Sequence, residues 1–335
     1  MELNSANLKN LNRLSANIGQ NITLVQGAGG NTSFKDGSVL WVKASGKWLA
    51  HAEQENIFVA VDLKKVCVDI DNGISDPVSK HILSNNNLRP SIETTLHALL
   101  PHHVVLHVHS VNAIAWAVNK KGAALLEKLL SGLNWAWVSY CKPGLDLAQA
   151  VKAKMIAKPD ILILENHGLV IGAEDFAAAE KLLKEVEERL QRSERKFIEP
   201  DLAYLKKSQA GWQLPFKPEI HSLATDPLSF QWAIAGAMYP DHVVFLKAKP
   251  FYLTNVDIPD VDKAITESDA LYVLIKDKGV LINPAISTTA QQMLLCQALV
   301  LLRLQTNDAV NYLSDNDIFS LLNWEAEKYR QQMIK

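Results

Sequence analysis

Two features of the sequence predict an α/β fold. Short runs rich in β-branched and aromatic residues, which are typical of strands, alternate along the chain with longer segments whose apolar residues recur every three to four positions, as on one face of a helix. The chain has 335 residues, of which 48% are hydrophobic and 21% charged, an ordinary globular composition. This length exceeds the size at which a single core usually stops growing, so we expect one large domain or two.

The first part of the chain reads as alternating helices and strands. Residues 1–20 form a predicted amphipathic helix, and a glycine-rich loop follows at residues 27–33. Pro90 and Ser91 mark the start of a further predicted helix. Strands are predicted at residues 38–43, 57–61, 103–107, 160–164 and 168–172, and further helices at 90–100, from about 112, and at 174–197.

The region 198–230 is richer in proline, serine and lysine, and we interpret it as a connector. It separates a first domain, residues 1–197, from a C-terminal α+β unit, residues 231–335. In that unit we predict strands at 242–247, 271–276 and 279–282, a helix at about 287–305 and a last helix ending in NWEAEKYRQQM.

The C-terminal unit contains a segment similar to one in the first domain. ILILENHGLVIGA (161–173) aligns with YVLIKDKGVLINP (272–284), and each is followed by a long predicted helix. Two interpretations remain open: an ordinary strand–turn–strand–helix unit, or a degenerate partial repeat in which Lys278 stands at the place of His167.

Charge and cysteine usage exclude several classes of protein. The net charge is −2 and no long basic block is present, so neither nucleic acid nor an anionic membrane is an implied partner. The N-terminus is polar, and the longest apolar stretches are far below the ~20 residues that span a bilayer. The three cysteines are widely spaced, which fits a reducing compartment, so we expect a cytoplasmic protein.

Three histidines are candidate metal ligands. His107 and His109 lie two apart in a predicted strand, so both imidazoles point to the same side. His167 follows another strand and precedes a glycine. Each histidine taken alone could also be an ordinary structural residue with no metal bound. Three protein ligands on one ion would leave a coordination position open for catalysis. His102 and His103, in the loop before the strand, are expected to be solvated.

Glu93 and two glycine-containing turns are further candidates. Glu93 lies in the first turn of a predicted helix, where it is either a surface partner of the helix dipole or an acid/base beside the metal. Residues 27–33 and 45–47 can present backbone N–H groups to an anion. The glycine pattern fits GxGxxG poorly and no acidic ribose-binding residue follows, so a nicotinamide cofactor is disfavoured.

The motifs GGNTS, KASGK, PSIETTLH, VLHVHS and ENHGLV occur in one order. By the order of these motifs, the chain resembles members of the class II aldolase/adducin family over roughly residues 5–195. That family includes the fuculose- and rhamnulose-phosphate aldolases. Residues 140–144 and the ending NWEAEKYR also resemble the aldolase half of bifunctional aldolase/short-chain dehydrogenase proteins. We expect the dehydrogenase half to be absent from this chain.

The resemblance implies a three-layer α/β/α fold around a mostly antiparallel sheet, assembled as a homo-oligomer, usually a tetramer. It implies a divalent metal, most often Zn²⁺, on His107, His109 and His167, with Glu93 as the acid/base. Ile92 stands where the family's aldolases often have a second serine, and Lys47 is a candidate to compensate. The positions that match the family's substrate-phosphate site are Gly30, Asn31, Thr32, Ser45, Gly46 and Ser91.

The function predicted from these residues is that of a metal-dependent aldolase acting on a sugar or sugar phosphate. It would cleave or form a C–C bond through a metal-stabilised enediolate to which Glu93 transfers a proton. An epimerase or decarboxylase on the same scaffold would use the same residues and remains an alternative. A non-catalytic adducin-like module is the other alternative, and the retention of three histidines and Glu93 argues against it.

Overall fold

The computed structural model describes residues 5–208, 211–254, 257–266, 268–325 and 327–329. The chain divides into two units. The first consists of residues 1–117, 122–191 and 323–335, and the second of residues 118–121 and 192–322. The boundaries expected from sequence at residues 197 and 230 remain a proposal.

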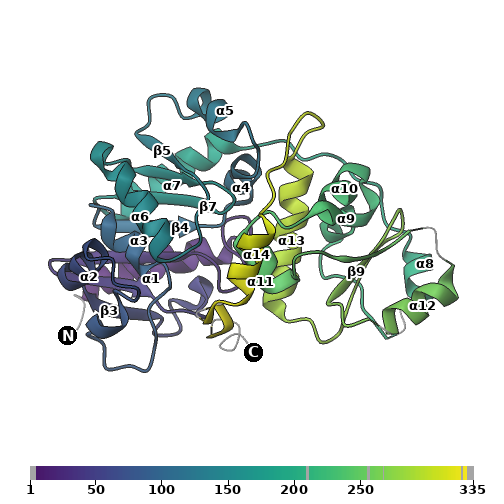
Figure 1. Ribbon diagram of the computed structural model, residues 1–335, viewed down its shortest axis with the longest axis horizontal. Helices are drawn as coiled ribbons and strands as arrows, with labels where there is room; N and C mark the ends of the chain where they lie inside the picture. The colour runs from purple at the N-terminus through teal and green to yellow at the C-terminus, as the bar shows by residue number, and fades with distance from the viewer. Residues whose placement is uncertain (1–4, 209–210, 255–256, 267, 326, 330–335) are drawn as a thin grey trace. The chain divides into compact units, whose positions relative to one another are not determined.

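A seven-stranded sheet forms the centre of the first unit (Figure 1). Its order is β3-β2-β1-β4-β7-β6-β5, and every neighbouring pair is antiparallel except β5 and β6. The strands are β1 (Asn31–Asp36), β2 (Val39–Lys43), β3 (Phe58–Asp62), β4 (Val104–Val108), β5 (Trp135–Val138), β6 (Ile161–Leu164) and β7 (Gly168–Ala173).

Helices cover both faces of this sheet and complete the three-layer α/β/α fold that was predicted, which is confirmed. One face packs against α1 (Ser5–Gln20), α4 (Val111–Ala117), α5 (Gly122–Leu129) and α7 (Phe176–Leu190). The other packs against α2 (Leu63–Asp71), α3 (Thr94–Leu99) and α6 (Leu145–Lys154). Single turns of 3₁₀ helix occur at Leu49–His51, Ser79–His81 and Met155–Ala157.

Alternation along β4 decides on which face the candidate site lies. Val104, Leu106 and Val108 belong to the core shared with α1 and α7, whereas Val105 packs with the helices of the opposite layer. His107 shares the face of Val105 because side chains two apart in a strand point the same way.

His102 departs from the expectation that it would be solvated. It is buried, and its Nε2 lies 2.8 Å from Asp160 Oδ1. Gly172 makes this burial possible, because a Cβ there would lie 2.2 Å from His102 Nδ1. His103 is exposed, as expected.

The second unit contains a three-stranded sheet and several helices. The strands are β8 (Phe251–Leu253), β9 (Tyr272–Ile275) and β10 (Gly279–Ile282). The helices are α8 (Leu202–Lys207), the 3₁₀ turn Pro218–His221, α9 (Ser222–Thr225), α10 (Pro227–Ala235), α11 (Pro240–Leu246), α12 (Ile258–Thr266), α13 (Thr288–Arg303) and α14 (Asp315–Leu322). The region expected to be a connector, 198–230, therefore includes short helices of its own.

One strand prediction in this unit is wrong. Residues 242–247 were expected to form a strand, but they lie in helix α11 and its C-cap. Pro240 takes the first helical position, where its fixed φ favours a helix start. All seven residues of α11 are buried, so the sequence shows an apolar run that does not distinguish a helix from a buried strand. The strand occurs instead at β8.

The three-stranded sheet repeats the arrangement of β5, β6 and β7. In each set the middle strand pairs with one neighbour in parallel and with the other antiparallel. Leu164 pairs with Gly168, and Ile275 pairs with Gly279 in the same register. The turn residues Asn166 and Asp277 both have positive φ, 53° and 60°. These likenesses favour the degenerate partial repeat, which we retain as a proposal.

In the part of the chain that the structure describes, no helix has the length and apolar character needed to cross a bilayer.

Candidate metal centre

Three strand ends bring the candidate ligands together. His107 lies in β4, His109 follows that strand directly, and His167 lies in the turn that joins β6 to β7. β4 pairs with β7 in the register His107↔Val170 and Val108↔Leu169, which brings the turn beside the end of β4. Asn166 adopts the left-handed conformation, φ 53°, so the turn is tight. All three histidines are buried.

The three imidazoles converge on one point. One ligand nitrogen from each lies within 4.8 Å of those of the other two, and His109 Nε2 is 3.1 Å from His107 Nε2. His107 Nδ1–H donates to the Leu169 carbonyl oxygen at 3.1 Å, which leaves the Nε2 lone pair directed at the cluster. For comparison, ligands about 2.0–2.1 Å from a tetrahedral Zn²⁺ lie about 3.3 Å apart.

Glu93 closes the cluster from the helical layer. It is the N-cap residue of α3, but its side chain makes no capping bond and turns toward the histidines. Its Oε2 is 3.3 Å from His107 Nε2, and its Oε1 is 3.3 Å from His167 Nε2. Burial raises the pKa of Glu93, but attraction to the three imidazoles and the hydrogen bond from Asn31 outweigh burial and lower the pKa to about 2. Glu93 is therefore a carboxylate.

A hydrogen-bonded chain behind Glu93 fixes its orientation. Asn31 Nδ2 donates to Glu93 Oε2 at 2.8 Å, and its Oδ1 accepts from His97 Nε2. His97 Nδ1 in turn accepts from Ser33 Oγ at 2.7 Å. Burial, with a contribution from His107, lowers the pKa of His97 to about 3, so this imidazole is neutral.

Sequence reasoning did not identify His97. A signal was present, because His97 lies four residues after Glu93 and residues at this spacing share one face of a helix. Asn31, which was predicted to bind substrate phosphate, here contacts the carboxylate of Glu93 and also lies 3.2 Å from Ser91 Oγ.

The glycine-rich loop approaches β4 closely. Gly30 has φ +57°, and a Cβ there would lie 2.8 Å from the His107 carbonyl oxygen, so only glycine fits. Lys43 is buried and its Nζ donates to Ala28 O at 2.9 Å and to Lys47 O at 2.7 Å. Lys43 thus joins the two loops that were predicted to bind an anion, and sequence reasoning did not single it out.

Of the remaining predicted phosphate-site residues, Ser45, Gly46 and Ser91 lie on the loop and its neighbouring segment, whereas the Thr32 side chain points elsewhere. Ser45 and Ser91 lie on neighbouring segments, because Ser45 N donates to Arg89 O and Ser91 N donates to Lys43 O. Gly46 supplies a turn with φ +77°. The Thr32 side chain is not brought to the metal centre: its Oγ1 lies 2.7 Å from Ser15 Oγ of α1, on the opposite face of the sheet.

Lys47, the candidate to compensate for Ile92, pairs with Glu55 at 2.6 Å. Its positive charge is already partly neutralised there.

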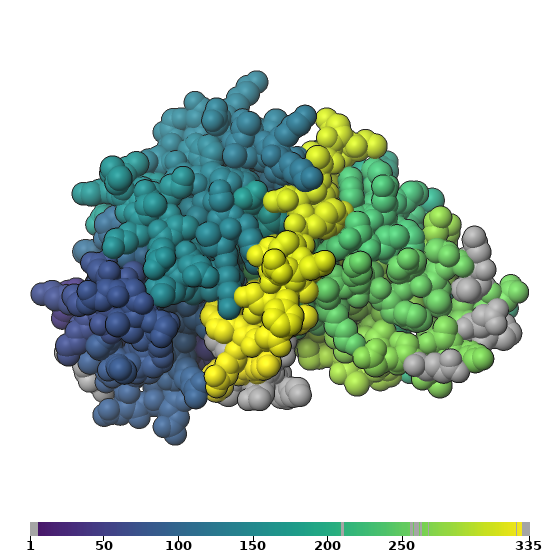
Figure 2. Space-filling model, viewed as in Figure 1, coloured from purple at the N-terminus to yellow at the C-terminus, as the bar shows by residue number. Residues whose placement is uncertain are grey.

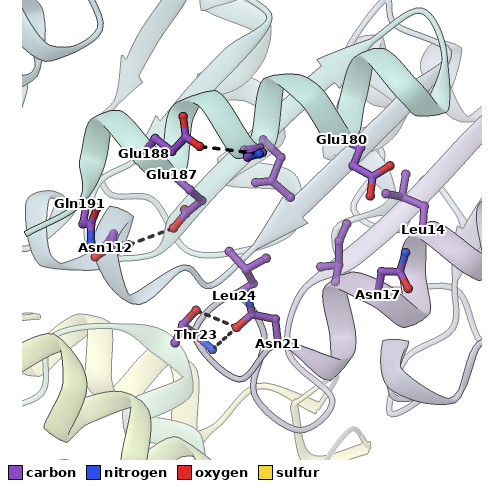
Figure 3. Close-up of a pocket in the computed structure, with 13 residues that line it drawn as sticks. Leu14, Asn17, Asn21, Thr23, Leu24, Asn112, Glu180, Glu187, Glu188 and Gln191 are labelled. Atoms are coloured by element: carbon purple, nitrogen blue, oxygen red, sulfur yellow. Dashed lines mark hydrogen bonds and ion pairs between the residues drawn. The ribbon is translucent and has the colours of Figure 1, made fainter.

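A separate cavity of about 430 Å³ lies between α1, α4 and α7 (Figure 3). Its lining combines apolar side chains, among them Leu14, Leu24 and Leu183, with polar and charged ones. Figure 3 shows Asn112 directed at Glu187, a hydrogen bond of 3.1 Å. None of the predicted site residues lines this cavity, which lies on the face of the sheet opposite His107.

The residues at the centre fit a divalent cation. Three buried imidazoles and one carboxylate are a donor set that suits zinc and other first-row divalent metals. The separations of 3.1 and 3.3 Å match those of ligands sharing one ion. Glu93 Oε1 is buried and accepts no hydrogen bond, as an oxygen directed at an ion would be. Within the described residues, this is the one group of three or more such side chains close enough to share a metal.

Comparison with known proteins covers the first unit. The family model for the class II aldolase and adducin N-terminal domain matches residues 14–192. An uncharacterized oxidoreductase, YuxG, of Bacillus subtilis is 32% identical over 174 residues, which are 47% of this chain and 25% of that protein. An L-fuculose phosphate aldolase of Methanococcus vannielii is 29% identical over 154 residues, 44% of this chain and 73% of that protein. The match therefore spans about a quarter of the Bacillus protein.

Among solved structures, the N-terminal class II aldolase domain of a conserved Thermoplasma acidophilum protein is 25% identical, with a TM-score of 0.49. The alignment covers 57% of this chain and 94% of the Thermoplasma acidophilum domain.

Proposed function

The chain belongs to the class II aldolase and adducin family, and from this we propose that it is a metal-dependent aldolase that cleaves or forms a C–C bond in a sugar or sugar phosphate. The observation that carries the proposal is the position of Glu93, whose two carboxylate oxygens each lie 3.3 Å from a candidate ligand nitrogen. A non-catalytic member would have no need of a buried carboxylate in this place, because burying a charge costs free energy unless it is paired.

His107, His109 and His167 would hold the cation, and their nitrogen donors suit Zn²⁺. When bound, the cation supplies Lewis-acid stabilisation of negative charge on the substrate's carbonyl and hydroxyl oxygens.

The chain's own residues supply the proton transfer and its orientation. Glu93, held as a carboxylate, removes a proton from the substrate carbon in the synthetic direction and returns it after cleavage. Asn31 donates to Oε2 and so fixes the orientation of the carboxylate. The neutral His97 fixes the Asn31 amide, which keeps the carboxylate from rotating. Burial of all these groups limits the entry of water that would protonate the substrate carbanion unproductively.

The fuculose-phosphate aldolase relatives support a sugar-phosphate substrate. The loops joined by Lys43 are the corresponding place for its phosphate, since Ser45 lies on one of them and Ser91 on the neighbouring segment. We also propose that the protein acts as a homo-oligomer, with a tetramer favoured by the family resemblance, which light scattering after gel filtration will measure.

The test is a cleavage screen of metal-reconstituted protein over ketose 1-phosphates and their unphosphorylated forms, with product identification by NMR. We expect an aldehyde and a three-carbon ketone or ketone phosphate as products. An epimer or carbon dioxide in place of these two fragments would assign the same site to an epimerase or a decarboxylase.

His107→Ala should bind much less metal because one of three nitrogen ligands is lost, whereas the exposed His103→Ala should bind as much as the unchanged protein. A protein that binds no divalent metal even after reconstitution would contradict the proposed function.

A further inference from the structure

The cavity of about 430 Å³ between α1, α4 and α7 takes no part in the proposed function, and all its lining residues belong to the first unit. The face drawn in Figure 2 is that of the opposite helical layer, whose blue and teal residues cover the purple helix α1 almost completely. Sites for small molecules typically have volumes of about 300–1,000 Å³. The cavity is therefore large enough for a small ligand that is separate from the substrate of the metal centre.

Two helical stripes form most of the lining. The stripe of α1 runs from Leu14 to Asn21, and that of α7 runs from Glu180 to its C-cap Gln191. Both follow the spacing of three and four residues that places side chains on one face of a helix. Closely packed helices meet through apolar side chains, but polar ones stand at several of these positions. The two helices therefore leave a space between them.

The buried part of the lining is apolar. Leu14, Ile18 and Leu183 are each at most 5% exposed and belong to the core beneath α1 and α7. Leu24 is half-buried and packs against the same core. A ligand that covers these side chains with an apolar body gains about 25 cal/mol for each Å² of apolar surface removed from water. This part of the cavity favours a ligand with a hydrocarbon or aromatic portion.

The exposed part of the lining is acidic. Glu180 and Glu188 are exposed, and Glu187 is half-buried. In the part of the chain that the structure describes, Lys184 is the one cation of the lining, and its Nζ lies 3.9 Å from Glu188 Oε1. Asn112 Nδ2 donates to Glu187 Oε2 at 3.1 Å, so a neutral partner holds this carboxylate in place (Figure 3). Three carboxylates and one ammonium give the lining a net negative charge.

The end of α7 adds to this negative potential. Glu187 and Glu188 lie in the last turn of the helix, where the backbone carbonyl groups carry a partial negative charge and favour a cation. Arg189, the basic residue of this turn, does not line the cavity. Its guanidinium pairs with Glu185 at 2.7 Å and donates to the Ser131 carbonyl oxygen. A positively charged ligand would therefore be attracted by the glutamates and by the helix end together.

We propose that this cavity binds a small amphipathic cation, an organic amine whose ammonium group faces the glutamates of α7 and whose apolar body covers Leu14, Ile18 and Leu183. The net charge of the lining selects against anions. The apolar side chains select against a bare inorganic cation, which gains nothing from them. This inference does not rest on the proposed function, because no candidate metal ligand or acid/base residue lines the cavity.

The test uses the full-length protein and three probes with one aromatic body: 2-phenylethylamine, 2-phenylethanol and phenylacetate, which are cationic, neutral and anionic near neutral pH. Binding is measured by ligand-observed NMR titration at low ionic strength, because salt screens exposed charges. We expect the amine to bind with a dissociation constant of about 1 mM or below, the alcohol at least about tenfold more weakly, and phenylacetate not measurably. Since an amine also coordinates metals, the titrations are repeated after treatment with a chelator, and the affinity should not change.

Removal of charge tests the recognition of the cation. Glu180→Gln combined with Glu187→Gln should abolish the preference for the amine over the alcohol and change the affinity for the alcohol by less than about twofold. The matched control combines Glu53→Gln with Glu127→Gln, which makes the same change in net charge at two exposed positions outside the cavity. This control should keep the preference.

Filling the cavity tests the location. Asn17 is an exposed residue of α1 that lines the cavity, so Asn17→Trp should fill the space and abolish binding of the amine and the alcohol without loss of the fold, which denaturant unfolding checks. Gln20→Trp adds the same side chain at an exposed position of α1 outside the cavity and should bind like the unchanged protein.

Three outcomes would overturn the inference. The first is that the alcohol binds as tightly as the amine, or that the preference survives in the double glutamate variant. The second is that a folded Asn17→Trp protein binds the amine normally. The third is that none of the probes binds, whether or not Asn17→Trp alters the oligomeric state measured by light scattering; an altered state would assign the cavity to an interface between copies of the chain.

Discussion

Gly168 lies between the metal ligands, and adding one methyl group there should disturb the centre without touching any ligand. A Cβ at this position would lie 3.5 Å from His107 Cε1 and from His109 Cδ2, which are ordinary contacts, but 2.6 Å from the Val108 carbonyl oxygen. Real Cβ contacts essentially never fall below 3.0 Å, so Gly168→Ala must part β4 and β7 by at least 0.4 Å at this point.

A shift of this size is large for a metal site. Ligand distances in a functional site are held within about 0.2 Å, so His167 would no longer match His107 and His109. Disturbing the groups that orient metal ligands typically costs 10–100-fold in affinity. At a zinc concentration about 1,000 times the dissociation constant, bound metal stabilises the fold by about 4.1 kcal/mol, and a 30-fold weaker site leaves about 2 kcal/mol. Overpacking should cost the metal-free protein about 1–3 kcal/mol in addition.

The assay has two parts: zinc affinity by competition with a chromogenic chelator, and denaturant unfolding with and without zinc. Gly37→Ala is the control, since Gly37 has φ +59° and no atom within 4 Å of its Cβ position. That substitution should cost about 1–2 kcal/mol in backbone strain and leave zinc affinity unchanged. A folded Gly168→Ala protein that binds zinc as tightly as the unchanged protein would refute the reasoning.

Three further predictions concern single side chains. Glu93→Gln should retain bound zinc, because the three histidines remain, and lose about 10²–10⁴-fold in turnover, measured as kcat on the substrate that the cleavage screen identifies; near-normal kcat would contradict the assigned role. Lys43→Met should lower the free energy of unfolding by about 1–3 kcal/mol, measured by denaturant titration, because two buried carbonyl groups lose their donor; no loss would mean that they find other partners. Burial lowers the pKa of Lys35 to about 8, so between about pH 8 and its ordinary value of 10.5 the unfolded chain binds more protons at this residue than the folded chain. The free energy of unfolding of the unchanged protein, relative to that of Lys35→Met, should therefore rise with pH over this range, and a flat or falling difference would contradict the assignment.

Most elements of the α/β fold were predictable because they carry clear local signals, whereas their three-layer arrangement was implied by the family resemblance. The apolar stripe of α1 and the β-branched runs of β2, β3 and β6 specify their type from neighbouring residues alone. α11 was not predictable in this way, because it is buried on every side and its apolar run fits a helix and a strand equally. Its type is set by Pro240 and by tertiary packing.

The ligands of the candidate site were predictable, and their supporting residues were not. His107 and His109 share a strand face by periodicity, and the order of the motifs added His167 and Glu93. His97 and Lys43 act through hydrogen bonds to residues 66 and 15 positions away, which no local pattern indicates.

Sequence by itself determined which side chains are available for chemistry, since a metal site requires imidazoles and a carboxylate and few patterns place them in this order. Only the tertiary structure decided how they are used. The pairing of β4 with β1 and β7 turns Asn31 toward Glu93 and Thr32 toward α1, a choice that depends on which face of the strand each residue occupies. Likewise, only the return of the chain to the first unit brings Trp324 to Gly144, because contacts between residues 180 positions apart are set by packing and not by local preference.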